Sequence, residues 1–403
     1  MLPNEAIERM RAMATAMDAV ELVPLEQCLG RVLAEPIRAP IDLPPFANSA
    51  MDGYAVRAAD VRAGESLRVV GTAFAGVPFS GDCPTGCCVR IMTGAPLPTM
   101  LDSIVMQEQT SANDGLVTFE QSVNAGQFVR QQGSEIAAGS TVLNAGLRIS
   151  PTEIAVLATV GLAAIPVFRR LTVALFSTGD ELQAPGMPLQ AGQIYDSNRH
   201  ALRSMLQQMQ VEVIDLGVIR DDLDAVRQAF IAADAQADVV ITSGGVSVGE
   251  ADFIKLVLDE LGQVNFWKLA IKPGKPFAFG QLPNSWFCGL PGNPVSSMVT
   301  CYELVQPLLA HLAGEQPRPS LTLTATLMTD LRKEAGRQEY QRGLLSRTAD
   351  GQLQVVAAGG QSSDMTLAMS RANCFIVLPQ ATQDPRAGSQ VSVAPFNQLL
   401  GGL

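Results

Sequence analysis

The chain has 403 residues, of which 47% are hydrophobic and 17% are charged, and its formal net charge at pH 7 is −11. This length predicts two or three domains, and the composition is typical of a globular protein rather than a disordered one. The negative charge argues against nucleic acid or an anionic membrane as the main partner, so an anionic ligand would need a local basic pocket.

The first predicted element is an amphipathic helix within residues 1–18. Glu5, Glu8 and Arg9 recur among apolar residues at helical spacing, which distinguishes this segment from a signal peptide. Further along, the longest apolar run covers residues 154–168, and it is shorter than a membrane span and contains glycine and proline. We therefore expect no contact with a membrane.

The seven cysteines are odd in number, and most of them lie in apolar runs. This usage indicates reduced thiols and predicts a cytoplasmic protein. Cys83, Cys87 and Cys88 are close enough in sequence to suggest zinc, but the chain has only two histidines and a fourth ligand is hard to find. Buried thiols are the favoured interpretation.

The predicted secondary structure changes along the chain. Residues 39–140 contain short predicted strands separated by glycine and proline, whereas residues 170–318 alternate strands with helices. Strand texture returns in residues 319–403, and mixed segments flank the first β region. The sequence thus predicts a multidomain α/β plus all-β protein, with a helical or mixed linker domain (1–38 plus 141–169), an inserted β domain, an α/β domain and a C-terminal β domain.

Within residues 170–318, the alternation predicts a mostly parallel sheet covered by helices. The predicted strands include Thr172–Ser177, Val211–Ile219, Asp238–Thr242 and Phe266–Ile271. Ligands bind beyond the carboxyl ends of the strands in such sheets. Small, acidic or basic residues follow five strands in succession, in the segments 177–181, 220–222, 243–252, 271–276 and 289–296. Five such strand ends in one sheet indicate a binding site rather than packing alone.

The segment 243–252 reads S-G-G-V-S-V-G-E-A-D and contains both glycines and acids. Glycines let a ligand approach the backbone closely, and backbone N–H groups and serine hydroxyls suit phosphate oxygens. Glu250 and Asp252 would repel a bare phosphate, but they suit a Mg²⁺ ion that lies between the carboxylates and the phosphates. The simpler alternative is a turn with an N-cap acid. The segment matches neither G-x-x-x-x-G-K-[ST] nor G-x-G-x-x-G.

Further motifs accompany this segment along nearly the whole chain. They are N-S-A-M-D-G-Y-A-V (48–56), R-I-M-T-G-A (90–95), S-T-G-D-E-L (177–182), K-P-G-K-P (272–276) and G-L-P-G-N-P-V-S (289–296). Together and in this order, they resemble the molybdopterin molybdenumtransferase family, to which the C-terminal region of gephyrin belongs. The resemblance implies that the α/β domain is of the molybdopterin-binding type.

The resemblance also implies a reaction, in which molybdate is inserted into adenylylated molybdopterin with Mg²⁺ to give molybdenum cofactor and AMP. It implies a homodimer, with a molybdopterin adenylyltransferase and molybdoenzyme-maturation proteins as partners. Two alternatives are the preceding adenylyltransferase, which would match only the region from about 170 to 315, and a non-catalytic gephyrin-like scaffold. The flanking β domains and the charged strand ends favour the insertion enzyme.

Site residues follow from the resemblance. The catalytic carboxylates would be Asp52, Glu181, Asp221 and Asp252, with Asp221 and Asp252 as ligands of Mg²⁺. Lysines of the K-P-G-K-P motif and a serine hydroxyl would hold molybdate, which is a tetrahedral dianion. The predicted substrate-binding residues are Thr93, Arg130, Ser243, Gly244, Gly245, Ser247, Gly249, Lys268, Lys272, Lys275, Pro276, Pro291, Gly292, Asn293, Pro294, Ser296, Arg337, Arg342 and Ser363.

Some of these residues have simpler interpretations. Asp52 would otherwise be a turn residue bonded to its own backbone, and Thr93 a strand-end hydroxyl; the family match favours the functional role for both. Arg130 is equally a substrate anchor or a solvated strand residue. Two positions depart from the family pattern, namely Glu135, where relatives commonly have Asp, and Ser362, where they usually have glycine.

The inserted β domain also predicts an assembly. Held by two connections, it is expected to project away from the sheet that it interrupts. It would then reach the strand ends of its own chain poorly and those of a neighbouring chain well, as in a two-fold dimer.

Overall fold

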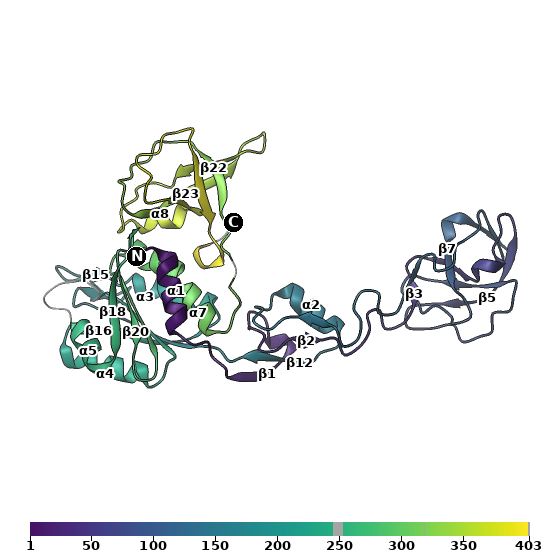
Figure 1. Cartoon of the computed structure of the whole chain (residues 1–403), viewed down its shortest axis with the longest axis horizontal. Helices are drawn as coiled ribbons and strands as arrows, with labels where there is room; N and C mark the ends of the chain where they lie inside the picture. The colour runs from purple at the N-terminus through teal and green to yellow at the C-terminus, as the bar shows by residue number, and fades with distance from the viewer. Residues whose placement is uncertain (245–252, 318, 402–403) are drawn as a thin grey trace.

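The computed structural model describes residues 1–244, 253–317 and 319–401. The molecule is elongated, with two packed domains at one end and a separate β domain at the other, joined by a narrow connecting region (Figure 1). Strands in the described residues form three six-stranded sheets and four two-stranded ones, including β14 (Leu182–Gln183) with β15 (Ile194–Tyr195). The predicted fold class, α/β plus all-β in several domains, is confirmed. No helix in these three ranges is long and apolar enough to cross a membrane.

The α/β domain is built on a six-stranded sheet. Five of its strands run in one direction, because β16, β13, β17 and β21 pair in parallel and β20 is antiparallel to both of its neighbours. The carboxyl ends of these five strands therefore meet at one edge, which we call the sheet edge. In sheet order the strands are β16 (Glu212–Ile219), β13 (Thr172–Thr178), β17 (Val239–Ser243), β21 (Trp286–Leu290), β20 (Pro276–Gln281) and β18 (Gln263–Lys268).

Helices cover both faces of this sheet, which explains why its central strands are buried and apolar along almost their whole length. One face is covered by α4 (Leu223–Asp234) and α5 (Phe253–Leu261). The other face is covered by α1 (Pro3–Met13), α3 (Asn198–Gln208), α6 (Pro294–Thr300), the π-helix η4 (Cys301–Val305) and α7 (Gln306–Leu312).

The position of α1 differs from the sequence-based expectation. The helix itself is where the amphipathic pattern predicts it, but the segment 1–38 was assigned to the linker domain as a whole. Instead Ala6, Met10 and Ala14 are buried in the core of the α/β domain. The backbone carbonyl of Ala14 lies 2.8 Å from His311 Nε2 on α7, so this helix belongs to the α/β domain in space.

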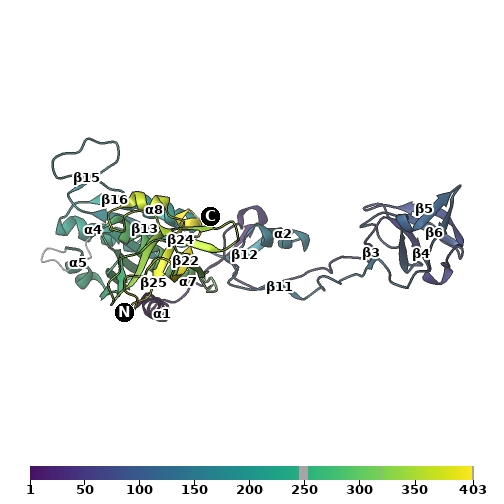
Figure 2. The ribbon, with the colours of Figure 1, turned by 90° about the horizontal axis from the view of Figure 1, so that it is seen from above.

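The connecting region consists of short paired segments around a small apolar core (Figure 2). β1 (Val20–Pro24) is antiparallel to β12 (Ala164–Phe168), and β2 (Ile37–Arg38) is antiparallel to β11 (Thr141–Leu143). The chain thus passes through this region twice, once outward and once back. It also contains η1 (Leu25–Gln27) and α2 (Pro151–Thr159), whose N-cap Ser150 forms a capping box with Glu153.

The distal β domain lies between β2 and β11 and occupies the far end of the molecule (Figures 1 and 2). β3 (Asn48–Ser49) and β10 (Val129–Arg130) form a short antiparallel pair where the chain enters and leaves this domain. Cys83 and Cys88 are buried free thiols in its interior, and burial raises the pKa of Cys88 to about 12. Its sheet contains β7 (Ser103–Met106), β4 (Gly53–Val56), β6 (Cys87–Ile91), β5 (Ser66–Ala73), β9 (Leu116–Phe119) and β8 (Thr110–Asn113), with η2 (Ala58–Asp60) and η3 (Gln107–Gln109).

The C-terminal domain packs directly on the α/β domain. The predicted strand Phe266–Ile271 is in fact two strands, and the second of them, β19 (Ile271–Lys272), leaves the α/β sheet to pair with β23. Tyr302 of η4 completes the junction by edge contact with Phe375 at a centroid distance of 5.8 Å. In sheet order the strands are β19, β23 (Gln338–Arg347), β24 (Leu353–Ala357), β22 (Leu323–Leu327), β26 (Gln390–Pro395) and β25 (Cys374–Leu378), with α8 (Thr366–Arg371) and η5 (Gln398–Leu400) outside the sheet.

Candidate active site

The centre of the candidate site lies where β17 and β21 end side by side at the sheet edge. The N–H of Gly244 donates to the carbonyl of Leu290 at 3.1 Å, and the φ angle of Gly244 is +96°, in the left-handed region that favours glycine. A Cβ atom at Gly292 would lie 3.9 Å from the Cα atom of Gly244. The two glycine-containing loops therefore run close together.

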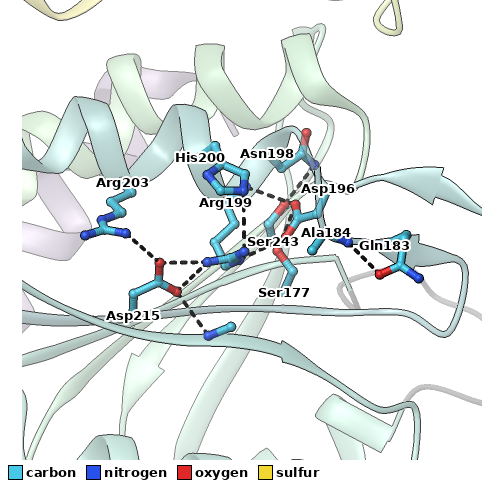
Figure 3. Close-up of polar contacts among 11 residues, drawn as sticks. Ser177, Gln183, Ala184, Asp196, Asn198, Arg199, His200, Arg203, Asp215 and Ser243 are labelled. Carbon is cyan, nitrogen blue, oxygen red and sulfur yellow. Dashed lines mark hydrogen bonds and ion pairs between the residues drawn. The ribbon is translucent and has the colours of Figure 1, made fainter. Parts of the chain in front are cut away.

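The start of α3 connects these two loops. The side-chain amide nitrogen of Asn198 donates to Ser243 Oγ at 2.9 Å, as Figure 3 shows, and to the backbone carbonyl of Gly292 at 2.7 Å. Ser243 is 2% exposed. Its hydroxyl, a predicted substrate contact, accepts this hydrogen bond inside the protein. Asn198 was not among the predicted site residues.

A buried ionic network supports the same helix start (Figure 3). Arg199 donates to Asp196 Oδ2 at 3.0 Å and to both carboxylate oxygens of Asp215 on β16, at 2.8 and 2.7 Å. Burial alone would raise the pKa of Asp215, but hydrogen bonds from Arg199 and the N–H of Gly217, with the Arg199 charge, lower it overall. Ser177 Oγ on β13 donates to Asp196 at 3.4 Å. This network ties α3 to two strands of the sheet.

Carboxylates gather at the ends of β13 and β16. The N–H of Asp221 donates to Asp180 Oδ1 at 3.2 Å. Partial burial, and then the charges of Asp180 and Glu181, raise the pKa of Asp221, which marks a region of negative potential. Within the described ranges, no group of three or more His, Cys, Asp and Glu side chains is arranged to hold a metal ion. The predicted second ligand, Asp252, lies outside the described residues, as do Gly245, Ser247 and Gly249.

Basic side chains lie where β19 meets β23. Lys272 Nζ donates to Glu339 Oε1 at 3.1 Å, and the Lys272 side chain remains 45% exposed whereas that of Glu339 is buried. Burial lowers the pKa of the Lys333 ammonium; Glu339 opposes this effect, and the charges of Lys272 and Arg337 add to it. The Lys333 ammonium itself is buried and donates to the backbone carbonyls of Glu334 and Thr382, at 3.1 and 2.9 Å. Lys268 and Lys275 are exposed nearby, at the end of β18 and immediately before β20.

A loop of the C-terminal domain reaches the sheet edge. Asn293 Nδ2 donates to Ser363 Oγ at 3.0 Å, and the N–H of Val295 donates to the Ser363 carbonyl at 3.0 Å. Pro294 is the first residue of α6 and fixes the backbone there, while Pro291 and Ser296 are buried. The structure therefore brings Gly292, Asn293 and Ser363 together, although 70 residues separate Asn293 from Ser363 in sequence.

Arg342 does not have the exposed position expected of an oxyanion ligand. It is 1% exposed, and its guanidinium donates to the carbonyls of Gly360 and Ser362 at 2.8 and 2.9 Å. Burial lowers the pKa of Arg342, and the Asp364 charge partly restores it. Arg342 therefore holds the loop that carries Ser363 rather than facing solvent.

The remaining predicted residues lie in the distal β domain, away from the sheet edge of the same chain (Figures 1 and 2). Asp52 accepts hydrogen bonds from the N–H and the hydroxyl of Thr93, at 2.7 and 2.8 Å. These bonds, with a smaller contribution from the charge of Arg90, lower the pKa of Asp52. Arg130 is exposed on β10 opposite Asn48. The structure therefore divides the predicted residues into two separate groups.

Family models match the chain in three consecutive parts. Residues 1–161 match the MoeA N-terminal region (domain I and II), residues 174–311 match a probable molybdopterin binding domain, and residues 324–396 match the MoeA C-terminal region (domain IV). A molybdopterin molybdenumtransferase of Haemophilus influenzae is 49% identical over 94% of this chain and 95% of that protein. The chain belongs to the molybdopterin molybdenumtransferase family.

Other members of the molybdopterin molybdenumtransferase family are also similar to this chain over most of its length. A relative from Nostoc is 36% identical over 93% of this chain and 88% of that protein. The crystal structure of a molybdopterin biosynthesis MoeA protein from Pyrococcus horikoshii has a TM-score of 0.81 at 31% identity, covering 98% of this chain and 99% of that one. Family membership is therefore supported along the whole length of the chain.

Sequence reasoning missed the part of this molybdenumtransferase site that begins α3. Tyr195-Asp196-Ser197-Asn198 leads into α3, and such polar residues ordinarily indicate an N-cap. The signal in the sequence was one more polar residue than a cap needs. In the structure, Ser197 occupies the N-cap position without a capping hydrogen bond, and Asp196 accepts from the N–H of Arg199 at 3.1 Å. Asp196 thus already caps the start of α3, and the Asn198 side chain contacts Ser243 and Gly292 instead.

Proposed function

We propose that the chain catalyses the insertion of molybdenum from molybdate into adenylylated molybdopterin, with release of AMP. The observation that carries this proposal is the convergence of Ser243-Gly244, Gly292-Asn293 and Ser363 at the sheet edge. Closely spaced glycine loops at strand ends suit a phosphate-containing ligand. Membership of the molybdopterin molybdenumtransferase family supports the same activity.

The basic residues next to this edge suit the second substrate. Molybdate is a dianion, and the charges of Lys272 and Arg337 both act on Lys333 next to the Lys272–Glu339 ion pair. The exposed ammonium groups of Lys272 and Lys275 are the groups that would hold the oxyanion by charge-assisted hydrogen bonds. Glu339 would orient Lys272 through their ion pair.

Magnesium fits the opposite side of the edge. Burial, and then the charges of Asp180 and Glu181, raise the pKa of Asp221, and a divalent cation would favour its ionised form. Asp221, together with Asp252, would hold Mg²⁺, and Glu181 would contribute negative charge beside it. The ion would supply neutralisation of phosphate charge during AMP release.

A homodimer in the cytoplasm would complete the site. Asp52 and Thr93 lie in the distal β domain, far from the sheet edge of their own chain (Figure 1). A two-fold arrangement would bring the distal β domain of each chain to the sheet edge of the other, and Arg130 would accompany it. A molybdopterin adenylyltransferase is the partner whose product this site would accept.

The test is AMP release. Purified protein, adenylylated molybdopterin, molybdate and Mg²⁺ should yield AMP and molybdenum cofactor, while omission of molybdate should leave the adenylylated pterin intact. An adenylyltransferase would instead consume ATP and release pyrophosphate from unmodified molybdopterin. A scaffold would do neither. Pyrophosphate release, or the absence of both products with a folded dimer, would contradict the proposal.

A further inference from the structure

Asn198 bridges two loops that belong to different strands. Its amide nitrogen contacts both Ser243 Oγ and the Gly292 carbonyl, at 2.9 and 2.7 Å. A carbonyl can only accept a hydrogen bond, so the nitrogen of the amide must face Gly292, and the orientation of the side chain is fixed. Asn198 Oδ1 is buried and has no hydrogen-bond partner among the described residues. Within those residues, the amide is therefore held by the two loops alone.

The base of this bridge is rigid. Arg199, the next residue, is locked between Asp196 and Asp215, and Asp196 also accepts from the N–H of Arg199 (Figure 3). α3 packs against α6, which begins directly after the Gly292 loop. Asn198 thus projects from a fixed helix start onto two loops whose separation it can set.

We propose that Asn198 and Ser243 form one positioning unit that sets the spacing of the two glycine loops and thereby the geometry with which they bind the phosphate of the adenylylated pterin. This inference rests on the proposed function. Ser243 is nearly fully buried and receives the Asn198 amide, so its hydroxyl acts inside the protein. Neither side chain needs to contact the substrate for the unit to act.

Asn198→Ala, Ser243→Ala and the double variant form a double-mutant cycle. Loss of one or two neutral hydrogen bonds predicts about a tenfold weaker affinity for AMP, used as the phosphate probe, in either single variant. Because the two residues act as a unit, the double variant should lose no more than about twofold beyond the worse single variant. The KM for adenylylated molybdopterin should rise in parallel, while the KM for molybdate stays within about twofold.

Two further variants keep the test decisive. Asn198→Asp has the same shape but cannot donate to the Gly292 carbonyl, so it should bind AMP at least as weakly as Asn198→Ala. Ser197→Ala removes the neighbouring side chain, which makes no capping hydrogen bond, and should bind AMP like the wild type. If Asn198→Ala fails to fold, the Asn198→Asp affinity decides.

Several outcomes would overturn the inference. Unchanged AMP affinity in both Asn198 variants would do so, as would losses that multiply in the double variant. An equal rise in both KM values would indicate a general structural defect instead. Wild-type protein without AMP release would overturn the proposed function itself, whereas normal wild-type turnover with unaffected Asn198 variants would overturn this inference alone.

Discussion

The sheet edge and the distal β domain hold their candidate site residues in different ways. At the sheet edge, Asn198, Ser243 and Gly292 come from three separate elements and meet through tertiary hydrogen bonds. In the distal β domain, Asp52 is exposed and is oriented by two hydrogen bonds from Thr93 of the same small domain. The edge therefore depends on the packing of the whole α/β domain, whereas the distal pair keeps its geometry wherever its domain is placed.

The largest expected effect tests whether these two halves act in one site across chains. Asp52→Ala and Asp221→Asn should each reduce AMP release by at least about a hundredfold, because each removes a carboxylate from one half. Mixed after complete subunit exchange, the two inactive proteins should recover about a quarter of wild-type activity. Half of the dimers would be mixed, and each would contain one intact site of two. AMP release and dimer size are the measurements.

The control for this experiment is Asp222, next to Asp221. Asp222 accepts hydrogen bonds from the N–H groups of Asp224 and Ala225 and caps α4. Asp222→Ala should therefore cost about 1 kcal/mol of stability and leave turnover per folded protein unchanged. Complete exchange with activity no higher than that of the parents would mean that both halves act within one chain.

The second expected effect separates molybdate binding from AMP binding within the sheet edge. Lys272→Ala should raise the KM for molybdate about tenfold to a hundredfold, because a charge-assisted contact is lost, while AMP affinity is retained. Steady-state kinetics at varied molybdate and AMP binding measure the two quantities. Arg332→Ala removes another exposed cation from the C-terminal domain and serves as the matched control. An equal rise in the KM for molybdate in both variants would mean that Lys272 acts only through the overall charge of the region, not through a direct contact.

The smallest expected effect on activity concerns the junction between the α/β and C-terminal domains. The distal β domain has no part in this junction. Glu303 lies in η4, and burial raises its pKa from 4.5 to about 7, partly offset by a hydrogen bond with Tyr340. The folded pKa exceeds the unfolded one, so the stability that protonated Glu303 contributes is fully present below about pH 4.5 and is lost as pH rises through about 7.

Glu303→Gln stays neutral and should avoid this loss. Above about pH 7 the variant should be more stable than the wild type by up to about 3 kcal/mol, with AMP release unchanged at the sheet edge. Unfolding measured from about pH 5 to 8 checks the difference. Glu315→Gln breaks an ion pair with Arg148 and should show no such gain. Parallel pH profiles for Glu303→Gln and wild type would mean that Glu303 is not a source of the pH dependence.

Much of the sheet edge could be predicted from sequence because strand ends have a local signature. Buried apolar runs end in glycine, serine or charge, and the direction of parallel strands brings such ends together. The C-terminal domain was harder. β23 contains the buried polar residues Glu339, Gln341 and Arg342, which interrupt the apolar alternation that identifies a strand.

Side-chain partners within the protein are the part that sequence reasoning did not anticipate. The family resemblance assigns both Arg342 and Ser243 to substrate binding. In the structure their polar groups contact the Ser362 carbonyl and the Asn198 amide, over separations of 20 and 45 residues. Residue type determines which hydrogen bonds a side chain can make, but only tertiary packing decides whether its partner is protein or ligand.

The paired passes of the chain through the connecting region have an evolutionary consequence. β3 and β10 bring Asn48 opposite Arg130, and β2 and β11 bring Arg38 opposite Thr141, so the two ends of the distal β domain are spatial neighbours. Insertion or removal of a segment with adjacent ends is tolerated, because the host chain can close over the gap with a short turn. The distal β domain can in this way be added or removed while the sheet of the α/β domain stays intact.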